Sequence, residues 1–258
     1  MTATRNFQTP NLALNPIQSF SISAGSRNIT DDVELTTFDI QGGKGRVVEG
    51  LPEPKTKFVI YSAIETLSRL HNIPTSFINR TTWEPQSRPL ISLNRDEWDN
   101  HQLVPWTGSE PCWVELVINN MDAAGHPFHL VSPIFTGKVG YHCINLTPWQ
   151  HGHSFYVVSS YRGKGGWDYY NPFDPSKEPR GGPFDTITPL RKDTVYVPAF
   201  GYVVLRFLAD NPGIWLLHCH ILWHQASGMT MAFQVLGDGK SGMKKTGIDA
   251  SAGETCRL

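Results

Sequence analysis

The sequence predicts an all-β protein built as a Greek-key β-sandwich. Short runs rich in Val, Ile, Thr, Phe and Tyr recur along the 258 residues, and Gly, Pro and Asn separate these runs. Strands of this length at this spacing are typical of two packed antiparallel sheets. The length leaves room for one large domain or two small ones.

The predicted strands are, in chain order, Val33–Ile40, Lys57–Ser62, Cys112–Asn119, Ser154–Ser160, Thr194–Val197, Tyr202–Leu208, Ile214–His218 and Met229–Leu236. A short helix is predicted at Arg95–His101, and residues 163–190, rich in Gly and Pro, should form a long ordered loop. We expect residues 1–30 to be a linker or the remnant of a preceding domain. Residues 31–236 then form one domain, and residues 237–258 form a polar tail.

Charge and hydropathy exclude two classes of partner. The 22 basic and 23 acidic residues nearly balance, and no basic run is present, so nucleic acid is not an expected partner. The longest apolar stretch, Tyr202–Trp223, is interrupted by Arg206 and Asp210 and should not span a membrane. The opening residues MTATRNFQTP lack the charged-then-apolar pattern of a secretory signal peptide.

The most informative segment is HCHILWHQASGM, which contains Cys219, His224 and Met229. One thiolate, several imidazoles and a thioether lie within a dozen residues, and this is a ligand set for copper. Imidazole and thiolate ligands with a weak axial thioether describe a blue-copper electron-transfer site. A buried, inert cysteine beside surface histidines is the less favoured interpretation.

The two histidines that flank Cys219 should serve a different metal. Neighbours at i±1 point to the opposite side of an extended chain, so His218 and His220 should face away from the copper that Cys219 binds. The second imidazole of the blue site must then come from elsewhere. His126, in a second cluster at residues 126–130 and 151–153, is the natural candidate.

These motifs resemble a known family. HPFHL with HGHSFYVV, and DNPGIWLLHCHILWHQASGM, are similar to the two C-terminal copper motifs of the multicopper oxidases, the family of laccase and ascorbate oxidase. The similarity also includes RKDTV at residues 191–195; it is good over roughly residues 110–236 and loose over the first hundred. It implies a domain of the cupredoxin type with copper as its cofactor.

The resemblance assigns roles to individual residues. It implies ligands of the type 1 copper at His126, Cys219, His224 and Met229, of the type 2 copper at His129, and of the type 3 coppers at His151, His218 and His220. Electrons would pass from Cys219 to His218 and His220. Met229 in the axial position should give a lower reduction potential than Leu or Phe would. His153 matches a family position that is not a ligand.

The implied activity is the oxidation of a small, phenol-like substrate by single electrons, with O2 reduced to water. Ascorbate and metal ions remain open as substrates. The family completes its oxygen-reducing cluster with HxH motifs in N-terminal cupredoxin domains, and such motifs do not occur elsewhere in this sequence. We therefore expect the chain alone to be inactive. The alternatives are a stand-alone blue-copper electron-transfer domain and a relic that no longer binds copper.

One departure from the family concerns residues 131–150. These twenty residues, from Val131 to Gln150, separate Leu130 from His151, where the family reads HPxHLHGH without interruption. Val131-Ser132 can be encoded by GTGAGT, a splice donor, and Gln150 by CAG, a splice acceptor. We interpret the segment as a retained intron that should impair binding of the type 2 and type 3 coppers. An extruded surface loop is the alternative, since closing such a loop costs little entropy.

Secretion is expected from the resemblance, and the acceptor sequences at Asn28 and Asn79 would then carry glycans. The family often has a C-terminal cysteine that bridges to its first domain, so Cys256 resembles half of such a disulfide. A free thiol on a polar tail is the open alternative. The sequence does not assign a partner to Cys112.

Overall fold

The structure, a computed structural model, describes residues 50–88, 90–131, 153–164 and 166–239. Four features singled out in the sequence lie outside these ranges: the predicted strand at Val33–Ile40, residues 132–150, His151 and Cys256. Within them, no helix has the length and the apolar character needed to cross a bilayer.

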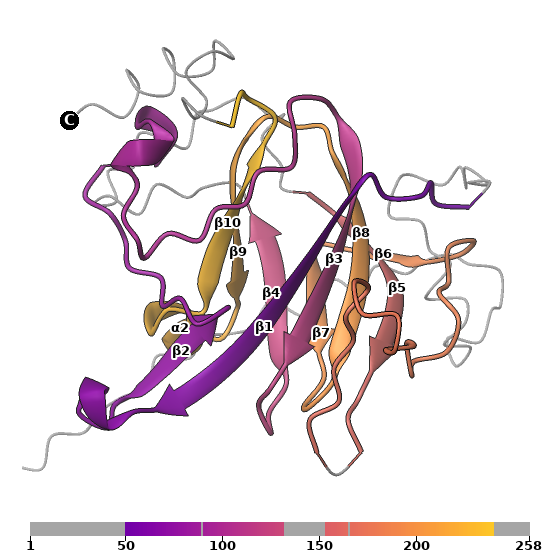
Figure 1. Cartoon of the computed structure of the whole chain (residues 1–258), viewed down its shortest axis with the longest axis horizontal. Helices are drawn as coiled ribbons and strands as arrows, with labels where there is room; N and C mark the ends of the chain where they lie inside the picture. Colours follow the sequence, from indigo (N-terminus) through magenta and orange to yellow (C-terminus); the bar gives the residue numbers. More distant parts are fainter. Residues whose placement is uncertain (1–49, 89, 132–152, 165, 240–258) are drawn as a thin grey trace, which may run out of the picture. The chain divides into compact units, whose positions relative to one another are not determined.

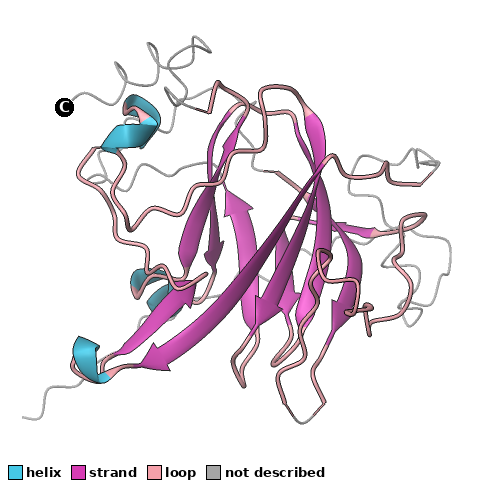
Figure 2. Cartoon of the chain, viewed as in Figure 1, coloured by secondary structure: helices cyan, strands magenta, loops and turns pink. Residues whose placement is uncertain are grey.

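Two β-sheets make up nearly all of the regular structure (Figure 2). The six-stranded sheet has the order β2-β1-β3-β8-β5-β6, and its strands are β1 Thr56–Thr66, β2 Pro74–Ile78, β3 Cys112–Asn120, β5 Phe155–Tyr161, β6 Leu190–Lys192 and β8 Tyr202–Ala209. The four-stranded sheet has the order β10-β9-β4-β7, and its strands are β4 His126–Val131, β7 Thr194–Val197, β9 Gly213–Cys219 and β10 Thr230–Val235 (Figure 1). All pairings are antiparallel except that of β1 with β3.

The core lies between the two sheets, as in a sandwich. Leu116 and Leu205 of the large sheet share one buried cluster with Leu217 and Phe233 of the small one. Phe58 of β1 also contacts Phe233 of β10, with ring centroids 5.3 Å apart. The predicted all-β Greek-key sandwich is therefore confirmed.

The outer face of the large sheet is covered as well. The described part of the loop 162–189 packs there, and Tyr170 joins Tyr202 and Val204 in a second buried cluster. Asn119 fixes this loop, because its side chain accepts a hydrogen bond from the Tyr170 amide at 2.8 Å and donates one to the Tyr170 carbonyl at 2.9 Å. Burial on both faces explains why β8 reads as an almost continuous apolar run.

Three short helical turns lie between β1 and β3 in the chain: η1 Ser68–Leu70, η2 Leu90–Ser92 and η3 Arg95–Glu97. The helix predicted at Arg95–His101 was too long. It ends after one turn because Trp98 adopts an extended backbone, donates its indole N–H to Leu90 O and packs beneath the Arg95 guanidinium. The one α-helix of the described residues, α2 Leu222–Ala226, connects β9 to β10.

Candidate metal centre

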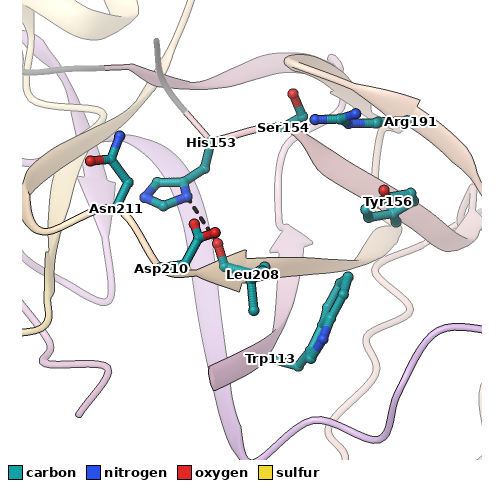
Figure 3. Close-up of a pocket in the computed structure, with 8 residues that line it drawn as sticks. All are labelled: Trp113, His153, Ser154, Tyr156, Arg191, Leu208, Asp210 and Asn211. Atoms are coloured by element: carbon teal, nitrogen blue, oxygen red, sulfur yellow. Dashed lines mark hydrogen bonds between the residues drawn. The ribbon is translucent and has the colours of Figure 1, made fainter. Parts of the chain in front are cut away.

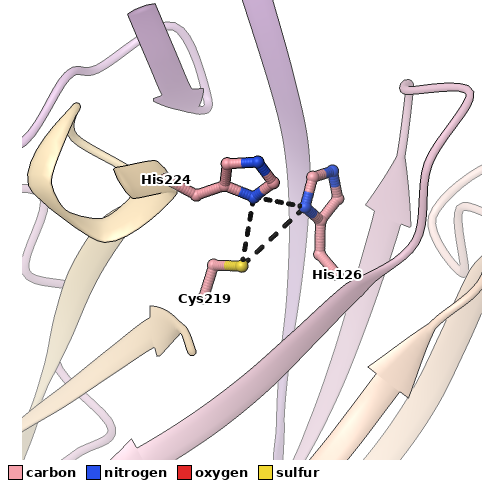
Figure 4. A group of neighbouring side chains, drawn as sticks. All are labelled: His126, Cys219 and His224. Carbon is pink, nitrogen blue, oxygen red and sulfur yellow. Dashed lines mark hydrogen bonds between the residues drawn. The ribbon is translucent and has the colours of Figure 1, made fainter. Parts of the chain in front are cut away.

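Three elements converge to form the candidate metal centre. His126 begins β4, Cys219 ends β9, and His224 lies in α2. Strands β4 and β9 are hydrogen-bonded neighbours, with Phe128 opposite Cys219, and this register brings His126 to the end of β9. The short helix then folds His224 back over the same point (Figure 4).

The donor atoms of these three residues lie close together. His126 Nδ1 is 3.8 Å from Cys219 Sγ and 3.0 Å from His224 Nδ1, and Cys219 Sγ is 3.5 Å from His224 Nδ1. All three side chains are buried. Met229, which precedes β10, is also fully buried and belongs to the same core cluster as Cys219.

Burial sets the protonation of this group. Desolvation raises the pKa of the Cys219 thiol to about 11, so the thiol is neutral near pH 7 without a cation beside it. Desolvation also lowers the pKa of His224, and the nearby His126 ring adds to that shift. An imidazole with a lowered pKa is neutral near pH 7 and offers a lone pair to a metal.

A carboxylate orients His126. Asp122 Oδ2 lies 2.8 Å from His126 Nε2, and Asp122 Oδ1 accepts the Ile64 amide at 2.9 Å. If Nε2 carries the proton donated to Asp122, Nδ1 is left with its lone pair facing Cys219 and His224. Such carboxylate–histidine contacts are common around metal sites. The sequence reasoning missed Asp122, although its position four residues before His126 was a usable signal.

Neighbouring side chains of an extended strand point to opposite faces, so a second group of imidazoles lies on the other face of β9 from Cys219. The ring centroids of His129, His218 and His220 are 5.8 to 5.9 Å apart in each pair. His129 stands opposite His218 in the β4–β9 register. Desolvation lowers the pKa of both His129 and His218, so both are neutral near pH 7. His151 lies outside the described residues.

His153 belongs to a separate environment. It lines a cavity of about 250 Å³ with Trp113, Tyr156 and Arg191, and its Nδ1 lies 3.1 Å from Leu208 O (Figure 3). Its ring packs against Trp215 rather than against the other histidines.

Comparisons with known proteins agree with the fold. Residues 150–238 match the model of the family described as multicopper oxidase. Laccase-17 of Arabidopsis thaliana is 35% identical over 166 residues, 63% of this chain and 22% of the laccase. The iron transport multicopper oxidase FET3 of Gibberella zeae is 31% identical over 217 residues, 81% of this chain and 29% of that protein.

Solved structures give the same result. The crystal structure of Fet3p, described as a multicopper oxidase that functions in iron import, superimposes with a TM-score of 0.53 and 27% identity, over 71% of this chain and 32% of that one. A mutant of the laccase from B. aclada also gives a TM-score of 0.53, with 25% identity over 80% of this chain and 32% of that one. The chain thus spans less than a third of the length of these relatives.

The β-sandwich with a buried His–Cys–His group defines a copper protein of the cupredoxin type. Over most of its length the chain is similar to a segment of proteins of the multicopper oxidase family, and residues 150–238 match the model of that family.

Proposed function

We propose that this chain is the electron-entry domain of a laccase-like multicopper oxidase. In this proposal His126, Cys219, His224 and Met229 hold a type 1 copper that accepts single electrons from a small reducing substrate. The observation that carries the proposal is the convergence of one thiol sulfur and two imidazole Nδ1 atoms on one buried point.

The residues fit copper. Metal bonds of about 2.0–2.3 Å to nitrogen and sulfur place neighbouring ligand atoms about 3–4 Å apart, and the three donor atoms lie within 4.8 Å of one another. A thiolate and two imidazoles with a thioether nearby are the donor set of blue copper. When bound, the copper supplies a one-electron redox centre. Cys219 contributes the anionic ligand, and the apolar cluster around it excludes water.

The chain itself offers the onward electron path. Cys219 is joined by the backbone to His218 on one side and His220 on the other, and both rings lie beside His129. We assign His129 to the type 2 copper and His218, His220 and His151 to the type 3 pair. The role of Cys219, His218 and His220 is then to connect the two centres by a few covalent bonds.

The oxygen-reducing cluster implied by the resemblance needs more imidazoles than the four proposed for it here, which are His129, His151, His218 and His220. We propose that N-terminal cupredoxin domains supply them and that the chain alone does not reduce O2. The exposed residues around the site support this: Leu222 and Trp223, which follow the exposed His220 in the chain, are 79% and 52% exposed, and the Trp223 ring lies 3.9 Å from that of His224. An apolar surface of this kind beside potential ligands suits burial against another domain.

The reducing substrate of the proposal is a small phenol-like molecule. A metal ion is the second candidate, favoured by the Asp122 carboxylate that contacts His126 at 2.8 Å and is 15% exposed. Three relatives carry the name iron transport multicopper oxidase. The rate at which a methoxyphenol and ferrous ion reduce the copper should be measured in the wild type and in Asp122→Asn. If the substitution slows reduction by ferrous ion only, the metal ion is favoured as the substrate.

A stand-alone blue-copper electron carrier is the second candidate function. It is favoured by the complete ligand set of the first centre within one chain. Under both candidate functions, about one electron equivalent of a methoxyphenol should remove the blue absorbance of the copper-loaded chain, and the chain alone should consume no O2. Adding the upstream domains separates the two functions, because only the oxidase then gains steady O2 uptake. Steady uptake by the chain alone would contradict the proposal.

Three further expectations stay predictions. Residues 131–150 are interpreted as a retained intron, and sequencing the mature transcript across codons 130–151 tests this. A transcript that keeps these codons would contradict it.

Secretion and glycosylation at Asn79 are tested by expressing the complete reading frame in a eukaryotic host and digesting the product with a glycosidase. The domain bounds 31–236 are tested by limited proteolysis.

A further inference from the structure

The loop that carries two of the proposed copper ligands is held from outside by a distant part of the chain. Residues 76–83, from the end of β2 through the next turn, lie against residues 224–229; we call residues 76–83 the clamp segment. The Ser76 amide donates to Ser227 O and the Trp83 amide donates to Gly228 O, both at 3.1 Å. The two segments are therefore joined as neighbouring strands would be.

Side chains continue this contact toward His224. Ser227 Oγ donates to His224 O at 3.2 Å, and Ser76 Oγ lies 2.6 Å from Ser227 Oγ. Since the single hydroxyl proton of Ser227 is used on His224 O, Ser76 is the donor in the serine pair. Ser76 is fully buried, so water does not replace its partner. The result is a directed chain from Ser76 through Ser227 to the backbone of a copper ligand.

The same carbonyl leads to Met229. His224 O also accepts the Met229 amide at 2.9 Å, and Met229 O accepts the Cys219 amide at 3.1 Å. One loop backbone thus connects His224, Met229 and Cys219. A displacement of Ser227 would be transmitted directly to the residue that carries the thioether.

The fit between the two segments is close. Gly228 has φ +113°, and a Cβ on it would stand 2.4 Å from Thr82 Cγ2 and 3.0 Å from Ser76 O. The clamp segment is itself fixed, because Thr82 Oγ1 donates to Ser76 O at 3.1 Å and the Asn79 amide donates to Tyr61 O of β1 at 2.9 Å. Residues 224–229 are therefore held against a segment that is itself hydrogen-bonded to strand β1.

We propose that Ser227 and Ser76 are positioning residues that hold the Met229 thioether at the copper and thereby set its reduction potential. This rests on the proposed type 1 site. A weaker axial thioether raises the potential of a blue-copper centre. Loosening the clamp should let Met229 withdraw, so the potential should rise.

The test uses the full chain loaded with copper and measures the reduction potential and the visible and electron paramagnetic resonance spectra. Ser227→Ala should raise the potential and change the spectra; Ser76→Ala, which leaves the bond from Ser227 to His224 O in place, should shift them less. Thr107→Val is the matched control. It removes a buried hydroxyl that donates to a backbone carbonyl, Gln234 O, at the far end of β10, and it should leave both readouts unchanged.

A double-mutant cycle decides whether the clamp acts through Met229. In a Met229→Leu background, Ser227→Ala should no longer shift the potential, because no thioether remains to be displaced. An equal shift in both backgrounds, or no shift in the wild-type background, overturns the inference while leaving the type 1 site intact. A wild-type chain without a thiolate-to-copper band overturns the type 1 site, and the inference with it.

Discussion

Asp122 accepts a hydrogen bond from His126, with 2.8 Å between Oδ2 and Nε2, and so turns the other ring nitrogen of His126 toward Cys219. The remaining carboxylate oxygen is held by the Ile64 amide of β1. The His126 ring is thus oriented through a contact with the large sheet, whereas its Nδ1 atom faces the candidate metal centre at the end of the small sheet. Such orientation before the metal arrives is a recurring feature of metal sites.

Replacing Asp122 with Asn should lower copper affinity about 10–100-fold, because an amide N–H facing Nε2 favours the wrong tautomer of His126. Competition of the chain against a chelator measures the affinity. Asp174→Asn is the control, since Asp174 is hydrogen-bonded to Ser176 in an exposed loop away from the site. Equal affinities of Asp122→Asn and wild type would refute the orienting role.

Copper uptake near pH 7 should release about one proton per chain. The pKa of the Cys219 thiol is raised to about 11, so the proton is still bound at pH 7 and must leave when the sulfur becomes a ligand. His224, with a lowered pKa, is already neutral and contributes none. Titration calorimetry in buffers of different ionisation enthalpy counts the proton. Uptake at pH 7 without proton release would show that Cys219 is not a ligand.

Two histidines three residues apart in β4 should behave differently. His126→Gln should abolish the thiolate-to-copper band, whereas His129→Gln should preserve it, because the His129 ring lies with His218 and His220 on the other side of Cys219. The absorbance of the band per chain is the measurement. Loss of the band in His129→Gln would contradict the division into two copper groups.

The buried ion pair between Arg206 and Glu115 should matter for stability. Arg206 Nε donates to Glu115 Oε2 at 2.9 Å, and both side chains are buried between β3 and β8. Arg206→Met should lower the free energy of unfolding by at most about 3–5 kcal/mol, because it removes one partner of the buried Glu115 carboxylate and leaves it the contact with Lys57 Nζ at 3.1 Å. Chemical denaturation measures the change.

The exposed pair of Arg88 and Glu97 is the control for this measurement, and Arg88→Met should cost about 1 kcal/mol or less. Replacing Arg206 with Met and Glu115 with Leu together should recover most of the loss, because no buried charge then remains. A double variant as unstable as Arg206→Met would show that packing, not charge, is responsible.

The strands that the sequence predicted correctly are those with strong apolar runs. Thr194–Val197 was predicted with its observed bounds, and Tyr202–Leu208 differs by one residue from β8. Strand β2 was missed because Pro74–Ile78 begins with a proline and two small polar residues. Its conformation depends on pairing with the neighbouring strand β1 and on contact with residues 227–228, which are distant in sequence.

The candidate site was predictable to the extent that it is local. Cys219, His224 and Met229 lie within eleven residues, so their spacing alone indicates copper. The contact of Ser76 with Ser227 was not predictable, since it joins two segments far apart in the chain that no motif connects. Asp122 was missed although it lies only four residues before His126. Residues that support ligands are therefore the part that required the structure.

The most direct test of the account is the visible and electron paramagnetic resonance spectrum of the full chain titrated with copper, beside Cys219→Ser. We predict an intense thiolate-to-copper band that saturates with a single blue copper per chain and is absent in Cys219→Ser. A colourless copper complex, or a band that survives in Cys219→Ser, would contradict the claim that His126, Cys219 and His224 form a type 1 site.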